Sequence, residues 1–308
     1  MKNTIFAHPE IRRLQLRTKH LVRSGLSGGY RSAFRGSGLA FSELRSYQPG
    51  DDVKRIDWRA SARSGNTLVK SYEEDRHLSM MVLLDTSLST GVPLGNITGQ
   101  PDTHSSQEGN VRAQLFASLV VSVAMQHGDE VGLCLCGGSV EEYRTPKKTR
   151  SHGQSTLECI AAYPKKLGSQ PASRGTSDLR PGIDAIMQHQ RKRGIVFIIS
   201  DFFLTDCELH LRRIAHRHDT ICVQLRHPFA ASIPAAGIVS FTDPETGTPV
   251  LIDTASRTTR RRVQETIARH ERGLAEMCRR SRIELITIDR DPVAPFVELL
   301  RSRMARLR

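Results

Sequence analysis

The sequence predicts an α/β protein with an open, mostly parallel β-sheet and helices on both faces. Two continuous apolar runs, 80–84 and 194–200, have the composition of strands that are buried on both faces, and each is followed by an aspartate. Segments with helical spacing of apolar residues alternate with these runs, as expected when crossover helices join parallel strands. The chain of 308 residues is long enough for one such domain and a smaller appendage.

The individual elements follow from periodicity and from turn-forming residues. Strands are expected at 80–84, 130–136, 194–200, 220–225 and 283–288, and helices at 9–24, 111–126, 156–163, 179–190, 206–217, 256–281 and 292–303. Residues 238–241 and 249–252 flank a Pro- and Gly-containing turn and predict a β-hairpin. We therefore expect an N-terminal segment, 1–77, with loops and short strands, followed by an α/β domain, 78–308, that includes the hairpin.

Composition favours a cytoplasmic protein with reduced cysteines. The longest uncharged apolar stretch, 115–125, is shorter than the roughly 20 residues of a membrane span, and the first residues lack a signal-peptide pattern. The six cysteines show no CxxC zinc pattern. Cys134 and Cys136 are separated by one residue of an expected strand, which is poor geometry for a disulfide. We expect the cysteines to lie in the core.

The formal net charge is +13, and basic residues gather towards both ends of the chain. Such charge attracts nucleic acid, anionic lipid or acidic protein without distinguishing them. No aromatic stacking platform accompanies the basic residues, so we expect no specific nucleic-acid binding, whereas peripheral contact with a membrane is compatible with the sequence. Arg301 and Arg303 are expected to be surface charges that speed encounter with an acidic partner.

The ends of the two apolar strands carry the candidate functional residues. Asp85 ends the first strand and is followed by Ser87 and Ser89, and Asp201 follows the second strand. Because ligands bind at the carboxyl ends of strands in open α/β sheets, we expect these side chains to share one site. Carboxylate and hydroxyl oxygens suit Mg²⁺ or Mn²⁺ better than zinc. The alternative interpretation is a Ser- and Thr-rich turn that caps a helix.

At these residues the chain resembles the von Willebrand factor type A domain and its metal-ion-dependent adhesion site. That site combines an Asp-x-Ser-x-Ser motif, a threonine from a second loop and an aspartate at another strand end. For the threonine position, spacing to the next helix favours Ser177 and residue type favours Thr176. The resemblance thus implies a metal held by Asp85, Ser87, Ser89, Ser177 or Thr176, and Asp201.

A second resemblance covers nearly the whole chain. The block 36–63, which contains Tyr47-Gln-Pro49-Gly50-Asp51-Asp52, is similar to the signature of the domain of unknown function 58 family. That family joins this block to a von Willebrand A-like domain. Ala40 and Ser46 depart from the acidic residues usual there, and the loop 91–110 is longer than usual. The resemblance implies a MoxR-type AAA+ ATPase as partner and a chaperone-like or assembly role, with no known reaction.

The residues of this block also predict its local structure. Pro49 and Gly50 form a turn signal, and the arginines at 45, 55 and 63 are candidates to pair with the aspartates at 51, 52 and 57. Trp58, the only tryptophan, is expected to anchor the segment to the α/β domain. These features favour a rigid platform over a docking surface.

Three functions compete. The favoured one is a non-enzymatic, metal-dependent protein-binding module, in which an acidic side chain of a partner completes the coordination of Mg²⁺ or Mn²⁺. A metal-dependent phosphohydrolase or nuclease is the alternative, but Ser87 stands where an Asp-x-Asp phosphatase needs its second acid. A scaffold that binds a membrane surface or nucleic acid through its basic ends is the third.

Overall fold

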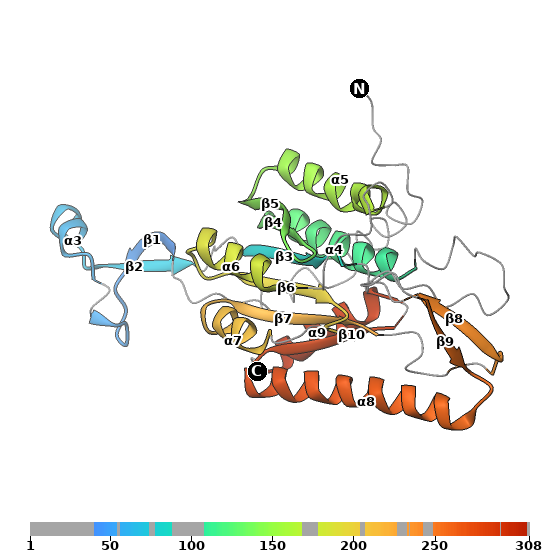
Figure 1. Ribbon diagram of the computed structural model, residues 1–308. Coiled ribbons are helices and arrows are strands. Elements are labelled where there is room, and N and C mark those ends of the chain that lie inside the picture. Colours follow the sequence, from blue (N-terminus) through green and yellow to red (C-terminus); the bar gives the residue numbers. More distant parts are fainter. Residues whose placement is uncertain are drawn as a thin grey trace. The chain divides into compact units, whose positions relative to one another are not determined.

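The computed structural model describes residues 40–53, 56–73, 78–87, 108–167, 178–203, 207–226, 233, 235–242, 249–289 and 291–306. The chain divides into two compact units (Figure 1), one formed by residues 35–78 and one that includes residues 79–308. The helix expected at 9–24 and the long loop at 91–107 lie outside the described residues.

The larger unit is built on a six-stranded sheet with the order β10-β7-β6-β3-β4-β5. Neighbouring strands are parallel except β5, which pairs antiparallel with β4. The mostly parallel α/β architecture predicted from the sequence is confirmed. The strands are β3 (Ser79–Asp85), β4 (Glu130–Cys136), β5 (Val140–Lys147), β6 (Ile195–Ser200), β7 (Asp219–Leu225) and β10 (Glu284–Ile288).

Strand β5 was not predicted from the sequence because this edge strand has no apolar run. Its residues, Val-Glu-Glu-Tyr-Arg-Thr-Pro-Lys, are exposed or half-buried along the whole strand. An edge strand with one solvated face needs only a few apolar positions, so its pattern resembles that of a loop.

Two layers of helices cover the sheet. Phe197 of β6 contacts Phe116 of α4 and Phe296 of α9, with ring centroids 6.1 and 6.3 Å away, so α4 and α9 share one face. The neighbouring residues Val196 and Ile198 point to the opposite face, which α6, α7 and α8 cover. The helices are α4 (Glu108–His127), α5 (Arg150–Leu167), α6 (Arg180–His189), α7 (Glu208–Arg217), α8 (Arg257–Arg280) and α9 (Val293–Ala305).

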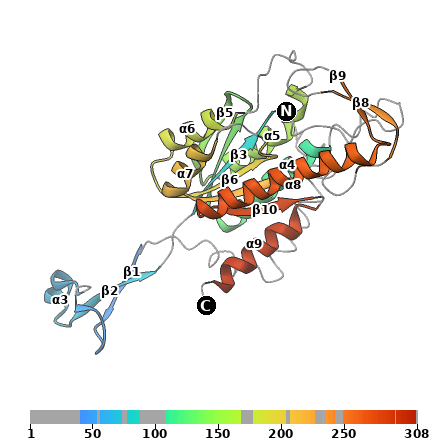
Figure 2. The ribbon, with the colours of Figure 1, turned by 60° about the horizontal axis from the view of Figure 1, so that its bottom comes forward.

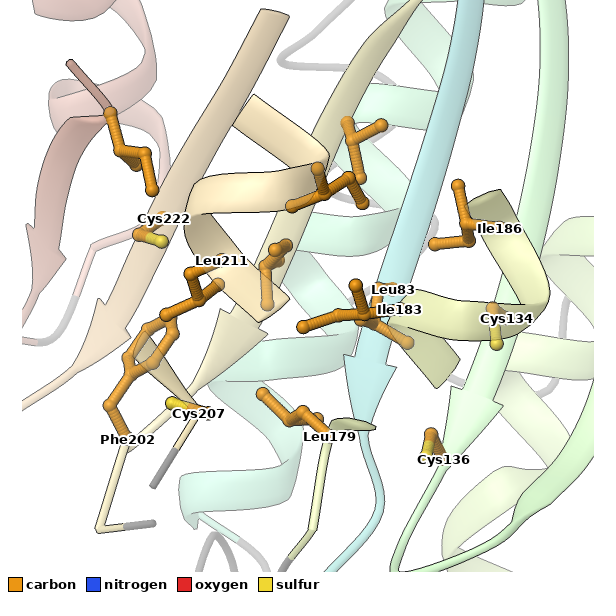
Figure 3. Close-up of a cluster of buried hydrophobic side chains, with 14 of the residues drawn as sticks. Leu83, Cys134, Cys136, Leu179, Ile183, Ile186, Phe202, Cys207, Leu211 and Cys222 are labelled. Atoms are coloured by element: carbon orange, nitrogen blue, oxygen red, sulfur yellow. The ribbon is translucent and has the colours of Figure 1, made fainter. Parts of the chain in front are cut away.

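The core beneath α6, α7 and α8 contains most of the cysteines. Figure 3 shows Cys134 and Cys136 of β4 on the same side of the strand, near Ile183 of α6. All six thiols are free, and five of them are buried. Burial is the main cause that raises the pKa of the Cys136 thiol to about 12, so the thiol stays protonated. These cysteines act as small apolar core residues, as expected from the sequence.

Charged and polar groups close the amino end of the sheet. Arg303 of α9 donates hydrogen bonds to Asp219, the first residue of β7, at 2.5 and 2.9 Å and to Glu284, the first residue of β10, at 2.6 Å. The backbone amide of Gly194 donates to Nδ1 of the buried His218 at 3.3 Å. Arg303 is therefore part of a buried ion-pair network, and its expected role as a surface charge is wrong.

Strands β8 (Ile238–Thr242) and β9 (Pro249–Asp253) form the predicted hairpin, which precedes α8. Among the described residues, no helix has both the length and the apolar character needed to cross a bilayer.

The smaller unit pairs β1 (Ala40–Ser46) with β2 (Leu68–Glu73) and carries a short helix, α3 (Trp58–Ser64). Asp57 caps α3 by accepting hydrogen bonds from the amides of Arg59 and Ala60, both at 3.1 Å. Arg45 and Asp51 form the expected ion pair at 2.6 Å, which fixes the turn between β1 and α3. Trp58 lies on α3 with 66% of its surface exposed, so it is not part of this unit's own core.

Candidate metal centre

The predicted aspartates lie at the carboxyl edge of the sheet, on adjacent strands. β3 and β6 are parallel, and Leu84 pairs with Ile199, so the next residues, Asp85 and Ser200, are neighbours across the two strands. Asp201 follows directly. The carboxyl ends of β3 and β6 thus bring Asp85 and Asp201 to the same part of the edge, which is where open α/β sheets bind ligands.

The carboxylate of Asp85 is buried and held on both oxygens. The hydroxyl of Ser200 donates to Oδ2 at 2.6 Å, and the backbone amide of Ser87 donates to Oδ1 at 2.9 Å. Asp85 is 1% exposed and Ser87 is 5% exposed. These two bonds orient the carboxylate at the end of β3.

Asp201 lies in a tight turn that begins at Ser200, the residue that donates to Asp85. The Ser200 hydroxyl that donates to Asp85 also accepts from the amide of Phe202 at 2.8 Å, and Oδ1 of Asp201 accepts from the amide of Phe203 at 3.0 Å. Phe202 has φ +57°, a left-handed conformation that L-residues other than Asn and Asp rarely adopt. Such backbone costs on the order of 1–3 kcal/mol and persists only when its surroundings fix it.

Thr86 anchors the turn after β3 to the neighbouring strand and helix. Its hydroxyl donates to Glu141 at 2.8 Å, its amide donates to the carbonyl of Cys136 at 2.9 Å, and its carbonyl accepts from the Tyr163 hydroxyl at 2.6 Å. A side chain at Gly137 would place a Cβ 2.5 Å from the Thr86 hydroxyl, so only glycine fits there. Since Thr86 is fixed on this side, Asp85 and Ser87 are also fixed.

Helix α8 reaches the same edge through His270. Its Nε2 lies 3.3 Å from the carbonyl oxygen of Asp201, and its ring stacks on Phe203 with centroids 3.9 Å apart and an interplanar angle of 14°. Because Phe203 is the second residue after Asp201, this contact restrains the turn from outside. The sequence analysis gave His270 no role, since a single histidine in a long charged helix carries no distinctive signal.

The segment before α6 also returns to this edge. The carbonyl of Asp178 accepts hydrogen bonds from the Gly138 amide and the Cys136 thiol, both at 3.3 Å. Burial raises the pKa of the Asp178 carboxyl, but hydrogen bonds from Arg180 outweigh this effect, and the pKa is lower than usual. Gly182 lets α6 approach the sheet, because a Cβ there would lie 2.7 Å from Leu83.

Three of the predicted ligands, Ser89, Thr176 and Ser177, lie outside the described residues. The remaining three, Asp85, Ser87 and Asp201, provide carboxylate and hydroxyl oxygens, the donors that Mg²⁺ and Mn²⁺ prefer. Among the described residues, no three His, Cys, Asp or Glu side chains come together as a metal-binding group. A metal here would therefore depend on serine oxygens as well as on the two carboxylates, and the donor set fits such an ion.

The sequence analysis found the two aspartates but missed the residues that orient them. Ser200 was treated as the last residue of an apolar strand, and Thr86 as the unspecified position of the motif. Ser200 ends β6 and Thr86 directly follows β3, and a hydroxyl residue at the end of an apolar run is the signal that could have identified them.

Comparison with known proteins gives one family match and several more distant likenesses. The family model described as protein of unknown function DUF58 matches residues 43–273 of this chain. An uncharacterized protein of Mycobacterium tuberculosis (strain ATCC 25618 / H37Rv) is 31% identical over 305 residues, which is 95% of this chain and 88% of that protein.

Two solved structures are among those that match the chain. The conserved hypothetical protein BatB from Bacteroides thetaiotaomicron is 12% identical, with a TM-score of 0.46 over 74% of this chain and 99% of that one. The SpRpn10 VWA domain is 11% identical, with a TM-score of 0.35 over 74% of this chain and 95% of that one.

Proposed function

Since the chain belongs to the DUF58 family, we propose that it is a protein-interaction module whose carboxyl edge binds Mg²⁺ or Mn²⁺ and, through that ion, an acidic residue of a partner protein. The observation that carries this proposal is the arrangement of Asp85. Its carboxylate is buried at the end of β3 and is oriented on both oxygens, and Asp201 directly follows the adjacent strand β6.

The charge of the donor set favours an external acidic ligand. Asp85 and Asp201 bring at most two negative charges, and the serine hydroxyls bring none. A bound divalent ion would supply positive charge and coordination positions that the protein leaves to water or to a ligand. An incoming carboxylate from a partner satisfies both needs, and the basic surface of the chain would speed its approach. This chemistry requires binding and no catalytic step.

We further propose that the partner is a MoxR-type AAA+ ATPase and that the pair acts in chaperone-like assembly or maturation. The resemblance of the signature block to its family supports the identity of the partner. The requirement for a carboxylate ligand supports the way in which it would bind.

The direct test is a pull-down of purified MoxR-type ATPase by the purified full chain. Binding should require Mg²⁺, be lost with EDTA, and fall sharply in Asp85→Ala and Ser87→Ala. Asp184→Ala is the matched control, because Asp184 is an exposed aspartate of α6 whose ion pairs lie on the surface. Tight binding that survives both EDTA and Asp85→Ala would place the interface elsewhere and contradict the proposal.

A further inference from the structure

Helix α8 has a strongly basic outer face. Its buried positions, Ile267, Leu274 and Cys278, repeat at helical spacing and face the sheet. In α8, all of whose residues the structure describes, seven arginines between Arg257 and Arg280 are exposed, against two exposed glutamates. The helix is 24 residues long, so this arginine face extends over about 36 Å.

The opposite helix layer lacks this excess of charge. In the described parts of α5 and α9, an exposed arginine is accompanied by an exposed glutamate: Arg150 by Glu158, and Arg301 by Glu298. Within the part of the chain that the structure describes, Arg261 is the one exposed arginine of α8 that forms an ion pair, with Glu265 of the same helix at 2.7 Å. The basic charge is therefore concentrated on one side of the domain and left for an external anion.

The hairpin that precedes α8 carries exposed aliphatic side chains. In the hairpin, Ile238 pairs with Asp253 and Ser240 with Leu251, so Ile238 and Leu251 share one face, and they are 73% and 70% exposed. The buried Val239 lies on the other face. Large aliphatic groups on a surface indicate contact with a protein or a membrane.

The hairpin is fixed to the first turns of α8. The amide of Thr254 donates to the carbonyl of Gly237 at 2.7 Å, and the Thr254 hydroxyl accepts from the amide of Ala236 at 3.0 Å. Arg260 of α8 donates to the carbonyl of Thr254. In Figures 1 and 2, α8 extends beyond the arrowheads of β6 and β7 to this hairpin. The hairpin with the exposed aliphatic residues is thus hydrogen-bonded to the segment that leads into α8, the helix that carries the arginine face.

We propose that α8 and the β8–β9 hairpin form a docking surface for an anionic lipid bilayer. Arginines bind lipid phosphate groups while exposed aliphatic side chains enter the boundary with the acyl chains. Nucleic acid would use the arginines but would leave Ile238 and Leu251 without a partner, because base stacking requires aromatic side chains. Binding to a bilayer is independent of the metal centre.

The test is co-sedimentation of the full chain with phosphatidylcholine vesicles that contain or lack phosphatidylglycerol. Arg262, Arg269 and Arg280 lie on one line along α8, since their spacings of 7 and 11 residues are close to two and three turns of about 3.6 residues. Replacing all three by Gln should weaken binding to the anionic vesicles on the order of 100-fold. Each basic residue near such a surface increases the affinity by about a factor of five.

The matched control replaces Lys147, Arg150 and Arg301 by Gln. These residues are exposed elsewhere on the same unit, and the net charge changes equally. The control should bind almost as the wild type does. Ile238→Ser combined with Leu251→Ser should remove the part of the binding that resists added salt. The proposal would be overturned by equal losses of binding in the two triple variants or by binding that does not prefer anionic vesicles. Binding of duplex DNA without any binding to vesicles would also overturn it.

Discussion

At the amino end of the sheet, Asp219 and Glu284 are ion-paired with Arg303, whereas at the carboxyl end Asp85 and Asp201 accept hydrogen bonds from a serine hydroxyl and from backbone amides. A charged partner within the chain neutralises an acid and contributes to stability. A hydroxyl or amide donor orients an acid and does not itself cancel the negative charge. The same residue type therefore has a structural role at one end of the sheet and, in our proposal, a binding role at the other.

The largest effect on stability should come from the amino end. Arg303→Ala would remove three charge-assisted hydrogen bonds to Asp219 and Glu284, and we expect the free energy of unfolding to fall by about 3 kcal/mol. Only 11% of the Arg303 side chain is exposed. Arg306→Ala is the control, because Arg306 is 70% exposed and lies 3.6 Å from Glu284, and it should cost less than about 0.5 kcal/mol. Similar urea midpoints for the two variants would contradict a structural role for Arg303.

A second effect at the amino end depends on pH. Burial, followed by the charges of Arg217 and Arg193, lowers the pKa of His218 to about 4. Below the ordinary pKa of about 6.5, the unfolded chain binds a proton that the folded chain does not, so stability is lost as the pH falls towards 4. The loss should reach at most ~3 kcal/mol.

His218→Asn tests this prediction, because an amide oxygen can replace Nδ1 as acceptor for the Gly194 amide without titrating. The difference in melting temperature between wild type and variant should change between pH 7 and pH 5 in favour of the variant. A difference that is the same at both values would show that His218 does not contribute to the pH dependence.

A smaller effect is expected at the carboxyl end. Ser200→Ala removes the donor to Asp85 and the acceptor for the Phe202 amide, and should cost about 1–2 kcal/mol. It should also weaken Mg²⁺ binding about 10-fold, because Asp85 would lose its orientation. Ser200→Thr retains the hydroxyl and should preserve metal affinity. If calorimetric titration with Mg²⁺ gave the same affinity for Ala and Thr, Ser200 would have no positioning role.

The sequence was informative about the two ends to different degrees. Asp85 and Asp201 could be found because each ends a continuous apolar run, and strand ends gather at one edge of a parallel sheet. The partners that distinguish the two ends could not be found. Arg303 and Arg301 are two residues apart in one basic helix, and only the packing of α9 shows that one is buried. Ser200 meets Asp85 across 115 residues, a contact that depends on the strand order.

Other differences have similar causes. Strand β5 was missed because an edge strand lacks an apolar run, and Trp58, expected to anchor the segment to the α/β domain, lies outside the core of its own unit. The sequence indicated a basic C-terminal region, 257–308, and within it the structure shows that the exposed arginines of α8 lie on its outer face. In a helix, exposure follows the angle of each residue around the axis, which a count of charges along the chain does not show.

The measurement that tests the account most directly is calorimetric titration of the purified chain with Mg²⁺, alongside thermal unfolding at the same concentrations. We predict one binding site and a melting temperature that rises with Mg²⁺ in the wild type and in Arg306→Ala. In Asp85→Asn, which retains the shape of the side chain, both the heat of binding and the rise should disappear while the fold is preserved. An equal response to Mg²⁺ in wild type and Asp85→Asn would contradict the account and leave the carboxyl end, like the amino end, with a structural role.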